Sequence, residues 1–227
     1  MKKETSILNK EIKGILFDLD NTLIDFMTMK KKCTRTAISA MIDAGLPLGK
    51  RDAYSKLMKM YNEFGIEDQS IYQKFLKKYH KLDYKILSAG IVAYRKEKIL
   101  HLVPYKNVRK TLSALKRKGL KIGVVSDAPR LQVWLRLTAM KLVNYFDVVL
   151  GFEDTGKLKP SAVPFRKALS KMKLKPFEVV FVGDNPRRDI TGAKKVGMST
   201  VLAQYGCNSK LKNSENSITH IEELLKL

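Results

Sequence analysis

From residue 104 onward, short apolar segments alternate with segments whose apolar residues recur at helical intervals. The apolar segments are 120–127, 146–152, 178–184 and 199–203, and the helical segments are 106–119, 129–142, 161–172 and 187–197. Strands that alternate with helices form parallel sheets through right-handed crossovers. The pattern therefore predicts an α/β fold, a three-layer Rossmann-like core in which helices cover both faces of a parallel sheet. A short amphipathic helix is expected at the carboxyl end, in IEELLKL.

The first strand of this sheet is expected at 12–19 (IKGILFDL), an apolar run of the kind that is buried on both faces. Helical periodicity then continues without a strand from Met27 to Leu102, with helix stops at Gly45 and Gly65. We therefore expect residues 1–26 and 104–227 to form the α/β catalytic core. Residues 27–103 are expected to form an inserted domain of three or four helices.

Composition narrows the class of protein further. The two cysteines, Cys33 and Cys207, have no spacing typical of a zinc site or a disulfide framework, which favours a reducing cytoplasmic location. The amino-terminal segment lacks the apolar stretch of a signal peptide, and no run approaches the length of a membrane span. We expect a cytoplasmic protein with no membrane partner.

The net charge of +22 is high, with 44 Lys and Arg against 22 Asp and Glu. The basic residues recur inside amphipathic segments, as at 30–32 and 116–118, which is typical of solvated helix faces. Two functional interpretations remain beside this one. The positive field could steer a small phosphorylated substrate to the protein, or it could hold nucleic acid by releasing counterions.

Polar residues follow the predicted strands where the strands end. Asp18 and Asp20 (DLDNT) follow the first strand, Ser126 and Asp127 follow the second, and Asp184 follows the strand VVFVG. The carboxyl ends of parallel strands meet at one edge of a sheet, where α/β proteins bind ligands. Asp189 lies five residues after Asp184, and Lys159 precedes another predicted helix.

Carboxylates that converge at a buried edge repel one another unless a cation or strong donors compensate. Asp18, Asp20 and Asp184 offer the oxygen ligands that a hard divalent ion prefers, and Mg²⁺ is the predicted cofactor. Ser126 and the backbone N–H groups after Asp18 and Ser126 could donate to a phosphate, with Lys159 supplying positive charge.

Each of these residues also has an ordinary structural explanation. Strand-end aspartates often cap the following turn, and Ser126 could do the same. Lys159 could be a surface lysine, and Asp189 could be a solvated residue in the first turn of a helix. The functional interpretation depends on all of them falling at successive strand ends of one sheet.

The motifs FDLDNT, VVSD, KLKP and GDNPRRD resemble, in this order, the four motifs of the haloacid dehalogenase-like hydrolase superfamily. The resemblance covers nearly the whole chain and includes a helical cap between the first two motifs. It implies that Asp18 is the nucleophile that forms an aspartyl-phosphate and that Asp20 is the general acid and base. It also implies phosphate binding by Ser126 and Lys159, and Mg²⁺ binding by Asp18, Asp184 and the backbone carbonyl of Asp20.

Further roles follow from the same resemblance. Asp189 would hold a metal-bound water or Lys159, Thr22 would support the site, and Asp127 would join the phosphate-binding loop. The third motif reads KPSA where the family usually has KPDP, and Lys157 lies close enough to be an alternative to Lys159. The overall pattern is similar to an archaeal group that acts on small phosphorylated sugars or aldehydes such as glyceraldehyde 3-phosphate.

The expected function is thus a Mg²⁺-dependent phosphatase of a small phosphorylated metabolite. A 2-haloacid dehalogenase is a rival within the family, but such members typically lack aspartate at the position of Asp20. A phosphomutase would share every catalytic residue. The alternatives outside enzymology are a nucleic-acid-binding protein, which the charge favours although no known binding motif accompanies it, and a protein that binds a partner through its helical domain.

Overall fold

The structure, a computed structural model, describes residues 12–207 and 216–226. The chain divides into two compact units. One lies within Met1–Asp25 and Val103–Leu227, and the other spans Phe26–Leu102. The predicted domain borders at 26/27 and 103/104 each lie one residue from these divisions.

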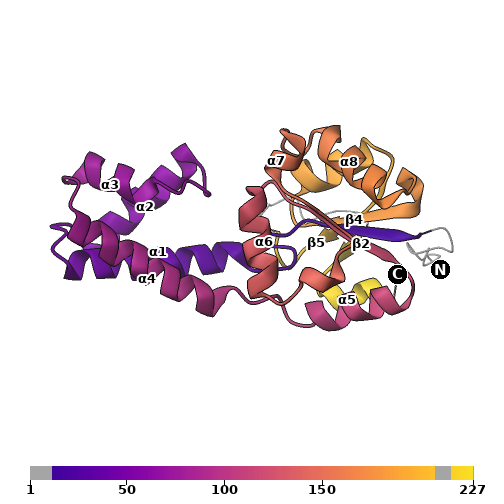
Figure 1. Ribbon diagram of the computed structural model, residues 1–227, viewed down its shortest axis with the longest axis horizontal. Helices are drawn as coiled ribbons and strands as arrows, with labels where there is room; N and C mark the ends of the chain where they lie inside the picture. Colours follow the sequence, from indigo (N-terminus) through magenta and orange to yellow (C-terminus); the bar gives the residue numbers. More distant parts are fainter. Residues whose placement is uncertain (1–11, 208–215, 227) are drawn as a thin grey trace. The chain divides into compact units, whose positions relative to one another are not determined.

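The first unit is built on a six-stranded sheet in which every pairing is parallel (Figure 1). Its strands are β1 (Gly14–Phe17), β2 (Lys121–Val125), β3 (Val148–Leu150), β4 (Val179–Gly183), β5 (Ser199–Ala203) and β6 (Ser217–Ile218). They lie in the order β3-β2-β1-β4-β5-β6. The predicted α/β class with a parallel sheet is therefore confirmed.

The register of the central strands brings the predicted site residues to one edge. Phe17 at the end of β1 lies beside Val124 of β2 and Val182 of β4. All three strands therefore end within two residues of these paired positions, at the same edge of the sheet. Asp18 and Asp184 consequently emerge together at the carboxyl edge of the sheet.

Helices cover both faces of the sheet, with α8 on one side and α5 on the other (Figure 1). The helices of this unit are α5 (Val108–Arg117), α6 (Arg130–Ala139), α7 (Phe152–Thr155), α8 (Ala162–Met172) and α9 (Thr191–Lys194). The apolar face of α8 packs mainly on β2 and β3, and its Phe165 ring meets the Phe181 ring of β4 edge to face with centroids 5.0 Å apart. This packing removes the apolar strand residues from water, which is the main source of stability in such a core.

Some local predictions were incomplete. The segment predicted as one helix at 187–197 consists of a π-helical turn, η3 (Pro186–Ile190), followed by the short helix α9. The carboxyl-terminal segment forms a 3₁₀-helix, η4 (Ile221–Leu225). The short elements α7 and β6 were not predicted, because two to four residues are too few to show periodicity.

The second unit consists of four helices: α1 (Phe26–Asp43), α2 (Lys50–Phe64), α3 (Ile71–Tyr79) and α4 (Tyr84–His101). Its core contains Tyr61 and Tyr72, whereas Phe64 is 44% exposed. The ammonium group of Lys30 is buried in this unit and lies 4.1 Å from the centre of the Tyr61 ring. None of the helices within the described residues has the length and apolar character needed to cross a membrane.

Candidate active site

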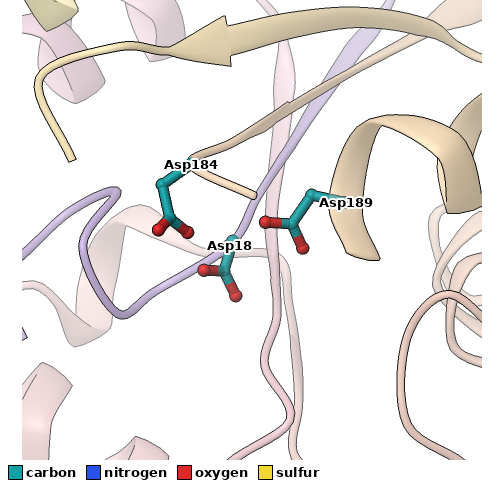
Figure 2. Close-up of side chains that lie close together, drawn as sticks. All are labelled: Asp18, Asp184 and Asp189. Atoms are coloured by element: carbon teal, nitrogen blue, oxygen red, sulfur yellow. The ribbon is translucent and has the colours of Figure 1, made fainter. Parts of the chain in front are cut away.

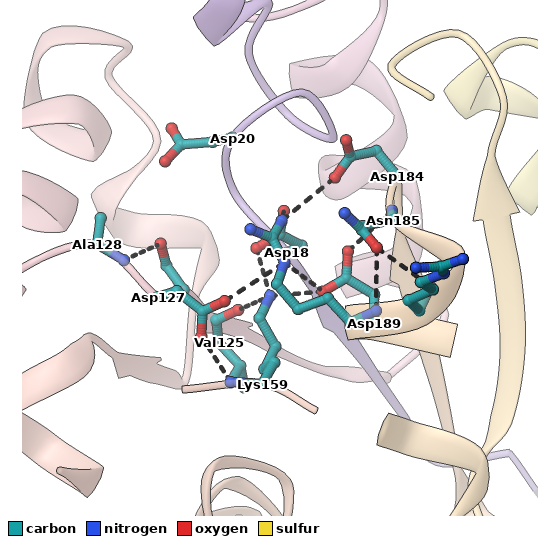
Figure 3. Close-up of polar contacts among 12 residues, drawn as sticks. Asp18, Asp20, Val125, Asp127, Ala128, Lys159, Asp184, Asn185 and Asp189 are labelled. Carbon is teal, nitrogen blue, oxygen red and sulfur yellow. Dashed lines mark hydrogen bonds and ion pairs between the residues drawn. The ribbon is translucent and has the colours of Figure 1, made fainter. Parts of the chain in front are cut away.

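Asp18 follows β1 directly and is in contact with Lys159 from the loop before α8. The Nζ of Lys159 donates a hydrogen bond to Oδ1 of Asp18 at 2.5 Å and another to the carbonyl of Val125 at 3.0 Å (Figure 3). Both side chains are almost fully buried. Lys157 is exposed, so of the two candidate lysines only Lys159 is shown reaching Asp18.

Asp184 and Asp189 complete a cluster with Asp18. One carboxylate oxygen from each of the three residues lies within 4.8 Å of the others, and all three residues are buried (Figure 2). Within the described residues, Oδ2 of Asp18 and Oδ1 of Asp184 accept no hydrogen bond. Buried carboxylate oxygens without donors are costly, and a divalent cation with oxygen ligands would satisfy them. The donor set therefore fits a metal ion.

The surrounding charges perturb the acid groups in different directions. Burial opposes ionisation of Asp18, but Lys159 and Arg188 outweigh it and lower the pKa of Asp18. Burial, together with the charges of Asp18 and Asp189, raises the pKa of Asp184 to about 8. The pKa of Asp189 is also raised, chiefly by burial. The cluster thus holds one carboxyl group whose pKa is lowered, which favours the ionised form that a nucleophile requires, beside two that resist ionisation without further positive charge.

Lys159 remains a cation in this environment. Burial alone would lower its pKa, but the carboxylates of Asp18 and Asp189 reverse the effect and raise the pKa of Lys159. Its Nζ lies 2.8 Å from Oδ1 of Asp189. Asp189 was expected to hold either Lys159 or a metal-bound water, and the structure places it against Lys159 and also within the carboxylate cluster.

Arg188 is a site residue that the sequence analysis missed. Its guanidinium lies 3.6 Å from Oδ2 of Asp18, 3.6 Å from Oδ1 of Asp184 and 3.3 Å from Oδ2 of Asp127. Its position immediately before Asp189, in the first turn after a strand end, was a signal that could have indicated it. The arginine brings a second positive charge to the carboxylates.

The turn that carries these residues is shaped by Asn185 and Gly183. Oδ1 of Asn185 accepts hydrogen bonds from the backbone N–H groups of Arg187 (3.1 Å) and Arg188 (3.0 Å). The backbone N–H of Asn185 donates to Oδ2 of Asp189 at 3.0 Å. A Cβ at Gly183 would lie 2.5 Å from the Cβ of Asp189, closer than packed atoms allow. Only glycine therefore permits this approach of the π-helical turn to β4.

The loop after β2 contributes Ser126 and Asp127. Oγ of Ser126 accepts a hydrogen bond from the N–H of Ala128 at 3.2 Å, which is the capping contact considered as its structural alternative. Oδ1 of Asp127 accepts from the backbone N–H of Lys159 at 2.9 Å. The Asp127 carboxylate thus ties the loop after β2 to the loop that carries Lys159, and it also lies near the guanidinium of Arg188. A carboxylate repels a phosphate, so a contact between Asp127 and a phosphate would have to come from the backbone N–H of Asp127.

Asp20 lies apart from the carboxylate cluster (Figure 3). Its Oδ2 accepts a hydrogen bond from Nη1 of Arg136 in α6 at 2.7 Å. Arg136 was also missed by the sequence analysis, although it lies on the apolar face of α6 with Val133 and Leu137. A charged residue on an apolar face is a signal that a buried partner exists. The prediction that the Asp20 carboxylate converges with those of Asp18 and Asp184 was therefore wrong: Arg136 engages it, and Asp189 is the third carboxylate of the cluster. The metal contact that the family resemblance implies for Asp20 is through its backbone carbonyl.

Thr22 is fully buried in the turn that follows Asp20. Its carbonyl accepts a hydrogen bond from the hydroxyl of Tyr205 at 2.9 Å. The ring of Tyr205 packs edge to face on Tyr105, with centroids 5.0 Å apart. Thr22 therefore supports the turn through its backbone carbonyl and its packing. It lies four residues after Asp18 in the same loop.

A parallel α/β sheet whose carboxyl edge holds a buried Asp-Lys pair and a potential metal site is suited to an enzyme that uses a carboxylate nucleophile. Residues 15–203 match the family model described as haloacid dehalogenase-like hydrolase, and the chain belongs to this family.

Relatives and solved structures agree with this assignment. The chain is 36% identical over 217 residues to a glyceraldehyde 3-phosphate phosphatase of Methanocaldococcus jannaschii, covering 95% of each chain. It is 33% identical to a protein of the same name from Pyrococcus furiosus, covering 96% of this chain and 93% of the relative. The crystal structure of a HAD phosphatase from Thermococcus onnurineus superposes with a TM-score of 0.70 at 25% identity, covering 95% of this chain and 97% of that one.

Proposed function

We propose that the protein is a Mg²⁺-dependent phosphatase that hydrolyses a small phosphorylated metabolite through an aspartyl-phosphate on Asp18. The observation that carries the proposal is the buried contact between Asp18 and Lys159 at the edge of a three-carboxylate cluster. A carboxylate that is both ionised and buried beside cations is suited to attack an electrophile that brings negative charge with it. A phosphate monoester is such an electrophile.

Asp18 performs the first displacement in this proposal. One of its oxygens attacks phosphorus while the bond between phosphorus and the leaving oxygen breaks, and the alcohol departs with a proton from Asp20. Asp20 then removes a proton from the water that attacks the aspartyl-phosphate, which releases inorganic phosphate and restores Asp18. Splitting one displacement into two lets the same two aspartates serve both steps.

The cations beside Asp18 bind and orient the phosphoryl group. Lys159 holds one oxygen of Asp18 in place and supplies charge to the phosphate, and Arg188 adds a second positive charge near the other oxygen. The hydroxyl of Ser126 and the backbone N–H groups after Asp18 and Ser126 are the proposed neutral donors.

Asp18 and Asp184 are the proposed side-chain ligands of Mg²⁺, with the backbone carbonyl of Asp20, and Asp189 either ligates the ion or holds its water. When bound, the ion would neutralise charge on the carboxylates and the phosphoryl group. The oxygen-only donor set favours Mg²⁺ over softer metals.

The substrate is proposed by analogy with the relatives. Proteins that match nearly the whole chain are named glyceraldehyde 3-phosphate phosphatases. We infer a small phosphorylated aldehyde or sugar of this kind as the substrate. The helical unit Phe26–Leu102 is the proposed cap that selects it.

The test is a panel of phosphate esters that includes glyceraldehyde 3-phosphate, assayed for phosphate release with Mg²⁺ and with a chelator. We expect hydrolysis by the wild type with Mg²⁺, and none above background by Asp18→Asn. Product analysis on a sugar phosphate separates hydrolysis from phosphoryl migration by a mutase. Halide release from 2-haloacids without metal, together with inactivity on every ester, would show that the protein is a dehalogenase instead.

A further inference from the structure

Arg136 is a fully buried arginine that donates a hydrogen bond to a proposed catalytic group. It projects from α6, its side chain is 1% exposed, and its Nη1 donates to Oδ2 of Asp20 at 2.7 Å. The two residues are 116 positions apart in sequence. Their contact is thus a product of the tertiary fold.

The position of Arg136 makes a purely structural explanation unfavourable. The same face of α6 carries Val133 and Leu137, and Met140 follows directly after the helix; all three are buried, and an apolar side chain at 136 would continue that face. Taking a guanidinium out of water is costly, and replacing a buried ion pair by apolar residues is often neutral or stabilising. An arginine at this place is therefore better explained by what it does to Asp20.

The backbone beneath Asp20 is held firmly. The N–H of Asn21 donates to the carbonyl of Ile24 at 2.6 Å, and the N–H of Leu23 donates to the carbonyl of Leu19 at 2.9 Å. Asn21 has a left-handed backbone, with φ of 62°. The turn therefore sets where the Asp20 side chain starts, and its rotamer remains to be set by a side-chain partner.

We propose that Arg136 is a positioning residue that holds the Asp20 carboxyl group in the orientation for proton transfer. Because Nη1 of Arg136 engages Oδ2, we assign the transferred proton to Oδ1. Oδ1 gives its proton to the leaving oxygen as phosphorus passes to Asp18, and it recovers a proton from the attacking water. Arg136 stays charged throughout and exchanges no proton. This inference rests on the proposed phosphatase function.

The dependence of rate on the leaving group tests the proposal. A general acid matters most when the departing alkoxide is strongly basic and least when it is a stable phenolate. We therefore expect Arg136→Met to lower kcat/KM by ~10- to 100-fold for an alkyl phosphate such as glyceraldehyde 3-phosphate. For p-nitrophenyl phosphate we expect a loss of no more than ~3-fold, because that leaving group needs little protonation. The ratio kcat/KM reports the step in which the leaving group departs.

Two further variants separate positioning from general damage. Arg130→Met makes the same replacement on the same helix at an exposed arginine that pairs with Asp154, and we expect wild-type rates. In an Asp20→Asn background, Arg136→Met should lower kcat/KM no further, since its effect passes through Asp20.

If Arg136→Met does not fold, as judged by circular dichroism, Arg136→Lys provides the same test. It keeps the charge with one donor group in place of a planar fork, and should show a smaller loss with the same leaving-group dependence.

An equal loss on both substrates, or a further loss in the Asp20→Asn background, would overturn the inference. A wild type that hydrolyses no phosphate ester with Mg²⁺ would refute the proposed function itself, which distinguishes the two failures.

Discussion

The ammonium group of Lys159 lies 2.5 Å from Oδ1 of Asp18, with both side chains at most 3% exposed. The contact joins residues 141 positions apart and places a permanent positive charge against a buried carboxylate. It explains how Asp18 stays ionised in a site where burial alone would protonate it.

Lys159→Met is expected to abolish hydrolysis and to destabilise the fold by about 3–5 kcal/mol, because Asp18 and Asp189 lose their buried counter-charge. Chemical denaturation measures the stability, and phosphate release measures activity. The matched control is Lys157→Met, an exposed lysine two residues away, which should be unchanged. If the control lost activity instead, the phosphate-binding lysine would have been misassigned.

The raised pKa of Asp184 predicts a pH dependence for the metal-free protein. Its pKa of about 8 in the fold lies above its ordinary value of 3.8, so the folded state binds a proton that the unfolded state releases. Its contribution to stability is present below pH 3.8 and is lost as pH rises through about 8. In chelator, the melting temperature should therefore fall between these limits, and less so in Asp184→Asn. Added Mg²⁺ should restore stability most at the alkaline end, and a curve unaffected by the substitution would contradict the assignment.

Arg188→Gln is expected to tighten Mg²⁺ binding about 10-fold, because the guanidinium lies within 3.6 Å of two proposed metal ligands and repels a second cation. Titration calorimetry without substrate measures the affinity directly. Arg187→Gln, at the exposed neighbouring arginine, serves as the control and should bind as the wild type does. Weaker binding in Arg188→Gln would show that the arginine supports the metal site.

Gly183→Ala tests the close approach of the η3 turn to β4. The added methyl group would lie 2.5 Å from the Cβ of Asp189, and we expect a loss of about 1–3 kcal/mol in stability together with reduced activity. Gly49→Ala makes the same change where nothing lies within 4 Å, and it should cost far less. Equal stabilities of the two variants would mean that the turn moves without cost.

Several predicted features were local enough to be found from the sequence. The strand at 199–203 was predicted with the bounds that the structure shows, and the predicted helix at 161–172 differs from α8 by one residue, because each is a continuous stretch of one apolar pattern. The π-helical turn at Pro186–Ile190 was not, since its widened geometry depends on contact with Gly183 and on the Asn185 side chain.

The site divides in the same way. Asp18 and Asp184 could be placed at strand ends because a parallel sheet aligns those ends whatever the side chains are. The pairing of Asp20 with Arg136, and the several contacts of Arg188, depend on which rotamers the packed neighbours allow. The spacing of residues within one segment of the sequence does not indicate these contacts.

The sequence by itself determined the α/β class, the helical insertion after the first strand and the acidic edge of the sheet, because each follows from periodicity within short segments. Only the tertiary structure decided that Asp189 joins the carboxylate cluster, that Lys159 and not Lys157 reaches Asp18, and that an arginine holds Asp20. These outcomes depend on contacts between residues more than a hundred positions apart, whose distances are set by the packing of the whole sheet and its helices.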